Sequence, residues 1–434
     1  MMGQVFTAAH GVVGGDWVDA PWLEVDAAGS VVDVGRGTPP PDRAPVRDLG
    51  SVILLPGFVN AHSHAFQRAI RGRTHRRGHD DPSSFWSWRE AMYETANRLT
   101  PDNVRAVSRR AFSEMLRAGI TCVGEFHYLH HQPSGQPYDD ANELGRQVLA
   151  AAADVGIRIV LLDVYYARAG HGQPALPEQR RFCDGSTDAY LRRVDALRSE
   201  GVPLGITPHS VRAVGADDLR RIAEYANTHG LPIHTHLSEQ PRENEETMVE
   251  HGVTPARVFA DADCLARPRA FTAVHAVHIE DADRALLAEQ HVCACPTTEA
   301  DLGDGIVGAV RLRAAGTRLA LGSDSNAVID LIQEARLLEM NERLARQARL
   351  RLNDAEGRLW PVLLDSMTRG GASALGVADA MGVLAVGRPF DACTVSLDHP
   401  FLDGLPSEAA LDAALASGTA AVIRHVFVGG QPRD

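Results

Sequence analysis

The sequence predicts an α/β protein: a parallel (β/α)8 TIM-type barrel with a small β-sandwich domain built from both chain ends. In the middle of the chain, apolar β-rich runs alternate about eight times with helical patterns, which is typical of such a barrel. Both ends instead show short alternating strands between Gly and Asp turns. Polar side chains repeatedly follow the apolar runs, where barrel strands would end.

We expect residues 1–57 and 382–434 to form the small β domain and residues 58–381 to form the barrel. The expected strands of the small domain are 4–7, 22–25, 31–34, 382–389, 391–396 and 422–428. The expected barrel strands lie within 52–62, 120–126, 157–165, 204–209, 233–237, 271–277, 292–296 and 319–323. Helical periodicity of apolar residues predicts helices at 104–118, 141–155, 189–198, 216–228, 281–289, 331–347 and 360–375.

The connection from residue 64 to residue 100 is unusually long and rich in Arg and Trp. A loop of that size in a compact fold usually covers or forms a binding site.

Charge and composition exclude several kinds of partner. With 43 Lys and Arg against 56 Asp and Glu, the net charge of −13 argues against nucleic acid and anionic membranes. The chain contains no lysine, so every fixed side-chain cation is an arginine.

No signal-like leader and no apolar run of about 18 residues are present, so we expect a cytoplasmic protein. The six cysteines, including Cys293 and Cys295, are interpreted as buried small hydrophobes.

The first expected barrel strand ends in His62-Ser63-His64. Side chains alternate along a strand, so the two imidazoles point the same way. This spacing alone is equally compatible with two surface histidines. Other strand ends carry Glu125, His127, His209, His236, Glu239, His275, His278 and Asp324. Several imidazoles and a carboxylate converging on one face would suit a divalent ion such as Zn²⁺, with a position left for water.

Taken together, these motifs resemble the amidohydrolase superfamily along nearly the whole chain. In the two-metal members a carbamylated lysine bridges the ions. This chain has no lysine and cannot supply that bridge. His236-Leu237-Ser238-Glu239 instead matches the H-x-x-E of the one-metal deaminase branch. The resemblance implies His62, His64, His236 and Asp324 as ligands of one divalent ion, Zn²⁺ or alternatively Fe²⁺. His234 lies deeper on the same strand, and His278 matches the sixth-strand position less well than His275.

The resemblance also assigns catalytic roles to three residues. A bound ion lowers the pKa of water toward ~7, and Asp324 lies where it would take the water's proton. Glu239 is expected to carry a proton to the departing nitrogen. His275 is expected to stabilise charge at the carbon under attack. The implied reaction is hydrolytic deamination or imine hydrolysis.

Four segments on the substrate side are similar to the formimidoylglutamate deiminase family. They begin at His64, Phe85, Gly124 and Thr207. This similarity implies a small dianionic substrate, N-formimidoyl-L-glutamate, hydrolysed to N-formyl-L-glutamate and ammonia in histidine degradation. An acidic protein must hold such a dianion with local arginines, for which the fork geometry of the guanidinium group is suited. The expected substrate-binding residues are Gln67, Arg89, Tyr128, His209 and Arg212.

Other interpretations remain open on the sequence. A solvated helix position would also explain Arg89, and the run Arg68, Arg71, Arg73, Arg76 and Arg77 is interpreted as solvated. Glu125 and His127 are candidates for orienting the metal ligands. A one-metal deaminase or chlorohydrolase acting on a purine, pyrimidine or triazine would share the metal and proton-transfer residues, and a non-catalytic scaffold is a further alternative. The resemblance implies a homodimer.

Overall fold

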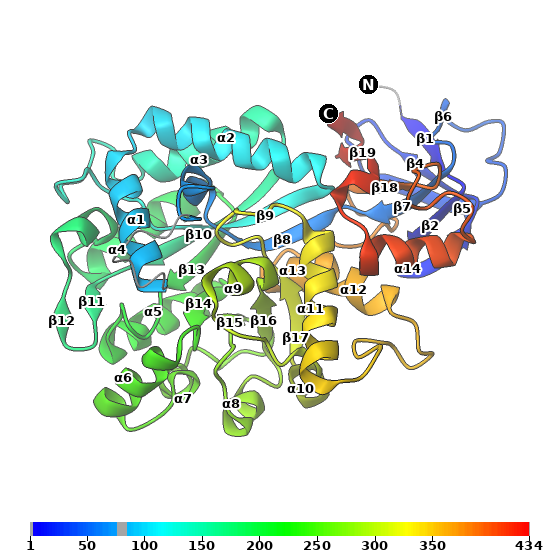
Figure 1. Cartoon of the computed structure of the whole chain (residues 1–434). Helices are drawn as coiled ribbons and strands as arrows, with labels where there is room; N and C mark the ends of the chain where they lie inside the picture. The colour runs from blue at the N-terminus through cyan, green and yellow to red at the C-terminus, as the bar shows by residue number, and fades with distance from the viewer. Residues whose placement is uncertain (1–2, 76–84, 434) are drawn as a thin grey trace.

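The computed structural model describes residues 3–75 and 85–433. Figure 1 shows a large barrel with helices around it and a smaller β-rich part beside it, to which both chain ends belong. The fold class predicted from the sequence is confirmed. Among the described residues, no helix is both long and apolar enough to cross a membrane.

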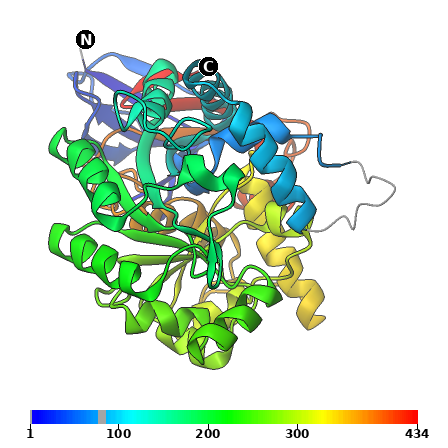
Figure 2. The same ribbon diagram turned by 90° about the vertical axis from the view of Figure 1, so that its left-hand side faces the viewer.

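The barrel is a sheet of eight parallel strands whose order follows the chain. Its strands are β8 (Phe58–Ser63), β9 (Ile120–His127), β10 (Arg158–Tyr165), β13 (Leu204–Pro208), β14 (Ile233–Leu237), β15 (Phe271–His275), β16 (His291–Ala294) and β17 (Arg318–Leu321). A parallel bridge between Ser63 and Asp324 joins the last strand to the first. The carboxyl ends of all eight strands therefore meet at one mouth. Figure 2, turned by 90° from Figure 1, shows the helices arranged around the strands.

Helices follow most barrel strands and pack around the sheet. They are α2 (Pro101–Arg117), α3 (Glu143–Val155), α4 (Thr187–Ser199), α5 (Ala216–His229), α6 (Pro241–His251), α7 (Pro255–Asp261), α8 (Asp281–Leu286), α9 (Pro296–Leu302), α10 (Ala309–Ala315), α11 (Leu331–Arg346), α12 (Trp360–Met367) and α13 (Arg369–Ala374). At the start of α2, the Thr100 side chain accepts a hydrogen bond from the Asn103 amide, and Pro101 occupies the first helical position. α13 contacts β8 and β17.

The smaller β-rich part contains two sheets. One has the order β5-β4-β1-β6 and the other the order β20-β19-β18-β7-β2-β3. Their strands are β1 (Gln4–Thr7), β2 (His10–Val13), β3 (Asp16–Asp19), β4 (Pro21–Val25), β5 (Val31–Arg36), β6 (Val46–Asp48), β7 (Val52–Pro56), β18 (Ala392–Ser396), β19 (Ile423–Val428) and β20 (Gln431–Arg433). Because β7 lies between β18 and β2, the two ends of the chain share a sheet. Helix α14 (Ser407–Ser417) and the 3-10 turn η3 (Ala420–Val422) complete this end.

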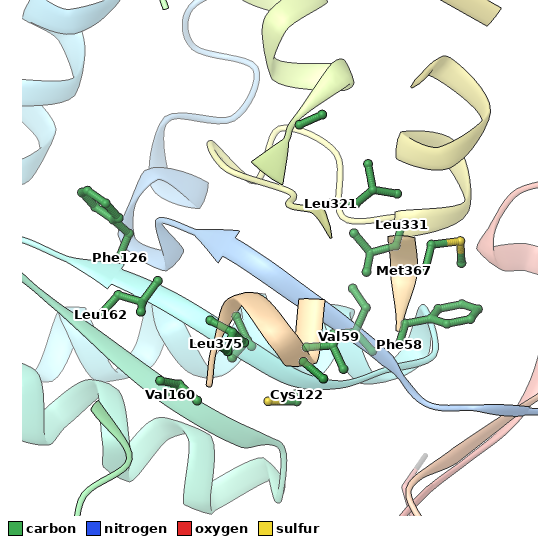
Figure 3. Close-up of a cluster of buried hydrophobic side chains, with 14 of the residues drawn as sticks. Phe58, Val59, Cys122, Phe126, Val160, Leu162, Leu321, Leu331, Met367 and Leu375 are labelled. Atoms are coloured by element: carbon green, nitrogen blue, oxygen red, sulfur yellow. The ribbon is translucent and has the colours of Figure 1, made fainter. Parts of the chain in front are cut away.

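Buried apolar side chains hold these parts together. Figure 3 shows part of the largest cluster, where Phe58 and Val59 of β8 lie close to Met367 of α12 and to Leu375, which follows α13. A separate cluster lies within the smaller β-rich part and stacks Phe6 on Phe390, with ring centroids 4.3 Å apart.

Several sequence expectations need correction. The predicted first strand, 52–62, is two strands in two different sheets, β7 and β8, separated at Gly57. Residues 382–389 form turns rather than a strand, with positive φ at Gly382 and Gly387. The connection 64–100 contains the 3-10 helix η1 (Ala65–Ile70) and helix α1 (Phe85–Arg98).

The remaining elements are the short strands β11 (Arg168–Gly170) and β12 (Gln173–Pro174) and the 3-10 helix η2 (Pro177–Phe182).

Candidate active site

Four buried side chains converge at the mouth of the barrel: His62, His64, His236 and Asp324. The Nε2 atom of His64 lies 3.2 Å from that of His62 and 3.4 Å from that of His236. The Oδ1 atom of Asp324 lies 3.2 Å from Nε2 of both His62 and His64. The four residues expected as metal ligands are thus brought together from β8, β14 and the end of β17.

The hydrogen bonds around this cluster show that it fits a cation. Nδ1 of His64 lies 3.0 Å from the Phe126 carbonyl, and Nδ1 of His236 lies 3.1 Å from the His209 carbonyl. A neutral imidazole that donates through Nδ1 keeps a lone pair on Nε2. Those lone pairs point at each other and at a carboxylate oxygen, an arrangement that a cation stabilises and that suits a divalent ion such as Zn²⁺.

Burial keeps the imidazoles of His62 and His236 neutral. It lowers the pKa of His62 to about 3. It also lowers the pKa of His236 well below its ordinary value, an effect that the neighbouring His209 reinforces. Neutral histidine is the form that binds metal.

The backbone is strained where the site is assembled. Asp324 and His275 have positive φ angles of 43° and 69°, which are uncommon for residues other than glycine. The Asp324 amide donates to the His62 carbonyl, and the His64 amide donates to the Asp324 carbonyl. These bonds fix the carboxylate beside the two histidines at the point where the barrel closes.

Glu239 and His275 stand beside the cluster. Nε2 of His275 lies 3.8 Å from Oε1 of Glu239 and 3.8 Å from Oδ2 of Asp324, while its Nδ1 lies 3.3 Å from Oε1 of Glu299. Burial alone would lower the pKa of His275, but the surrounding carboxylates raise it well above its ordinary value. His275 is therefore suited to donate hydrogen bonds, and Glu239 to exchange a proton with a group bound between them.

A pocket opens above these residues. All five residues expected to bind substrate line it: Gln67, Arg89, Tyr128, His209 and Arg212. Helix α1 and the segment after β10 add further walls: Phe85, Trp88, Met92, Tyr93, Tyr166 and Ala169. The Gln67 amide donates to the Tyr128 hydroxyl at 2.9 Å.

The two pocket arginines differ in their partners. Nη2 of Arg212 donates to Oε2 of Glu239 at 3.1 Å, and its Nε lies 3.0 Å from Oε2 of Glu243. Arg89 instead stacks over the rings of Trp86 and Tyr93, 4.5 and 5.6 Å from their centroids. Within residues 3–75 and 85–433 no carboxylate pairs with Arg89, so its charge is open to an anion in the pocket.

The remaining histidine and glutamate candidates lie elsewhere. Nε2 of His234 contacts the Ala374 carbonyl at 2.7 Å, below the cluster, and Nε2 of His278 contacts the Asp304 carbonyl at 2.8 Å. Glu125 accepts a hydrogen bond from the amide of Ala65, next to His64. Among the described residues, His127 forms no hydrogen bond with any of the four expected metal ligands. The structure therefore does not support the interpretation that His127 orients them.

The arginine run after β8 is only partly solvated. Arg68 and Arg71 both pair with Glu114, and Arg71 also donates to the Asn326 carbonyl. Arg76 and Arg77 lie outside the described residues.

Sequence reasoning missed several groups that shape the site. Glu299, which contacts His275, comes from α9, and Glu243 comes from the first turn of α6; nothing in their local sequence marks them. Tyr166 directly follows β10, so the rule that found the other strand-end residues would have found it as well. Tyr93 lies in α1, within the stretch treated as a connection.

Comparison with known proteins now adds to this geometry. Residues 53–433 match the model of the amidohydrolase family. The chain belongs to the amidohydrolase family. This amidohydrolase is 37% identical to formimidoylglutamate deiminase from Pseudomonas aeruginosa over 423 residues, or 96% of this chain and 91% of that protein. It is 30% identical to a 5-methylthioadenosine/S-adenosylhomocysteine deaminase from Natronomonas pharaonis, covering 88% of this chain and 82% of that one.

Solved structures agree with this assignment. A crystal structure of an amidohydrolase from Brucella melitensis superposes with a TM-score of 0.90 at 32% identity, covering 99% of this chain and 94% of that one. An adenosine deaminase from Xanthomonas campestris with bound zinc has a TM-score of 0.82 at 22% identity, covering 99% and 92%. The second likeness shows the fold alone. The resemblance predicted from the sequence is confirmed, and the chain is an enzyme of the amidohydrolase type.

Proposed function

We propose that this amidohydrolase hydrolyses N-formimidoyl-L-glutamate to N-formyl-L-glutamate and ammonia, as a step in histidine degradation. The observation that carries the proposal is the pocket, which places Arg89 and Arg212 in the walls above a His/Asp cluster with Glu239 and His275 at its side. Two guanidinium groups match the two carboxylates of this substrate. The 37% identity to formimidoylglutamate deiminase from Pseudomonas aeruginosa supports the same substrate.

The chain's own residues account for binding and proton movement. His62, His64, His236 and Asp324 would hold one divalent ion, for which we propose Zn²⁺ with Fe²⁺ as the alternative. When bound, such an ion supplies Lewis acidity that lowers the pKa of a water molecule toward ~7. In this proposal Asp324, whose Oδ2 lies 3.8 Å from Nε2 of His275, would accept a proton from that water.

The leaving nitrogen needs a proton so that it departs as ammonia. Glu239, 3.8 Å from His275 and hydrogen-bonded to Arg212, is the carboxylate that would deliver it. His275 would donate a hydrogen bond where charge develops during attack at the formimidoyl carbon. The formimidoyl C–N bond to the terminal nitrogen breaks, a C–O bond forms, and the formyl group stays on glutamate.

Ammonia release separates this proposal from a ring deaminase. N-formimidoyl-L-glutamate, guanine and S-adenosylhomocysteine would each be offered to the zinc-loaded protein. We expect ammonia only from the first, because the rings have no pair of carboxylates for Arg89 and Arg212. Ammonia release from guanine or S-adenosylhomocysteine, with none from N-formimidoyl-L-glutamate, would contradict the proposed substrate.

The metal and the assembly are parts of the same proposal. Elemental analysis of the purified protein should find one divalent ion per chain, and removal by a chelator should abolish ammonia release until Zn²⁺ or Fe²⁺ is restored. A protein without an ion, and without activity when one is added, would support the scaffold alternative. We further propose a cytoplasmic homodimer, which analytical ultracentrifugation would test at the level of assembly.

A further inference from the structure

Two tyrosine hydroxyls meet in the wall of the pocket. Tyr93 of α1 and Tyr166 after β10 are both buried, and their hydroxyl oxygens lie 3.3 Å apart. Nε2 of Gln179, a fully buried residue of η2, donates to the Tyr93 hydroxyl at 2.8 Å and to the Tyr166 hydroxyl at 2.9 Å. Three polar groups distant in sequence thus form one hydrogen-bonded cluster.

The orientation of the Gln179 amide is fixed. Its Oε1 atom accepts a hydrogen bond from the Leu176 amide at 2.8 Å, so its nitrogen must face the tyrosines. Both hydroxyls are therefore acceptors from Gln179. Each hydroxyl also carries a single proton of its own.

Counting those protons shows that one donor remains. At most one of the two protons serves the contact between the hydroxyls. For the other, the described part of the chain offers no hydrogen-bond acceptor. Burial raises the pKa of Tyr166 well above its ordinary value, so the Tyr166 hydroxyl keeps its proton. The pair consequently presents one O–H to the pocket.

The surroundings favour an anion at that position. The guanidinium of Arg89 lies over the Tyr93 ring, and Arg89, Arg212 and both tyrosines line the same pocket. A carboxylate only accepts hydrogen bonds, so it complements an O–H beside guanidinium groups.

We propose that Gln179 turns the Tyr93–Tyr166 hydroxyl pair into a hydrogen-bond donor for one carboxylate of the substrate, and that this pair determines specificity for acidic substrates. The inference rests on the proposed function, since it names further residues that would recognise the same dianion. A ligand that presents a hydrogen-bond donor there would meet an unpaired donor instead, which disfavours it.

Binding of the reaction product to the zinc-loaded protein tests the pair without turnover. Calorimetry would measure N-formyl-L-glutamate and two analogues that each lack one carboxylate, N-formyl-4-aminobutyrate and N-formyl-L-norvaline. Tyr93→Phe/Tyr166→Phe should weaken binding of N-formyl-L-glutamate by about 10- to 100-fold, the usual effect of losing a hydrogen bond to a charged group. It should leave unchanged the binding of the analogue that lacks the contacted carboxylate.

Gln179→Glu provides a second variant of nearly the same shape. A carboxylate at this position would accept both tyrosine protons, leaving none for the ligand, so we expect a loss of at least about 10-fold. The matched control is Tyr165→Phe, whose hydroxyl contacts Asp218 and Thr187 outside the pocket. Zinc content and thermal melting would establish that each variant is folded.

Several results would overturn the inference. It is wrong if both folded variants bind N-formyl-L-glutamate as the wild type does, if both single-carboxylate analogues are weakened equally, or if the wild type does not bind the product. Failure of the proposed function looks different: the wild type would release no ammonia from N-formimidoyl-L-glutamate, while binding of the dianion would still depend on the tyrosine pair.

Discussion

At the scale of single residues, the site depends on one carboxylate with two neighbours. Oε2 of Glu239 lies 3.1 Å from Nη2 of Arg212, and Oε1 of Glu239 lies 3.8 Å from Nε2 of His275. Glu239→Gln keeps the shape of the side chain and removes its ability to deliver a proton. We expect turnover to fall by roughly 10²–10⁴ while zinc content, measured by elemental analysis, stays at the wild-type level. Near-normal turnover would remove Glu239 from the mechanism.

The two pocket arginines should respond differently to truncation. Arg212→Ala and Arg89→Ala should each lower kcat/KM. The expected loss of transition-state stabilisation is about 1.5–3 kcal/mol, the value of a hydrogen bond to a charged group. Arg212→Ala should also lower the melting temperature, because it leaves the buried Glu239 and Glu243 without their cation. Arg242→Ala is the control, since Arg242 also stacks on Trp86 but lines a neighbouring cavity and not the pocket above the His/Asp cluster. Equal melting temperatures for the two pocket variants would contradict this account of Arg212.

At the scale of elements, the base of the barrel depends on a short helix that the periodicity did not resolve. The apolar pattern predicts one helix over 360–375, but the backbone breaks at Thr368 into α12 and α13. The break lets α13 approach the strands: a Cβ atom at Gly371 would lie 2.4 Å from the Val59 carbonyl oxygen of β8. Local sequence does not encode such an approach, because it depends on a strand about 300 residues earlier in the chain.

That contact makes a prediction about stability. Gly371→Ala would force its new methyl group into the Val59 backbone, which cannot move without shifting β8. We expect a loss of about 1–3 kcal/mol in the free energy of unfolding, measured by chemical denaturation. Gly170→Ala, where a Cβ atom meets nothing within 4 Å, should change it by less than about 1 kcal/mol. Similar values for both variants would show that α13 adjusts freely.

At the scale of the whole molecule, the sequence predicts those site residues that lie at the ends of the barrel strands. Because the parallel strands all end at one mouth, His62, His64, His236 and Asp324 meet once the strands are identified. Gln179 and Glu299 were not predictable, since each reaches the site from a short helix whose position depends on packing far along the chain. Helix α1 is absent from the list of expected helices, and several of its aromatic and apolar residues line the pocket.

The free energy of unfolding of the whole chain should depend on pH in part through one buried histidine, His291. His291 of β16 is fully buried, and its Nε2 lies 2.8 Å from the Ser373 hydroxyl. Burial, with smaller contributions from His234, Arg269 and Arg318, lowers its pKa to about 3. In the unfolded chain a histidine has a pKa of about 6.5. Between these values the unfolded state binds one more proton, so His291 makes the fold less stable as the pH falls from about 6.5 toward 3.

The expected result is a change in slope. In wild-type protein this histidine contributes about 1.4 kcal/mol of lost stability per pH unit over the lower part of that range. His291→Asn should reduce the dependence of the unfolding free energy on pH by about one proton, measured by denaturant titrations between about pH 4.5 and 6. Ser373→Ala removes the same hydrogen bond but keeps the titrating ring, so its slope should match that of the wild type. An unchanged slope in His291→Asn would mean that His291 takes up its proton in the folded barrel as readily as in the unfolded chain.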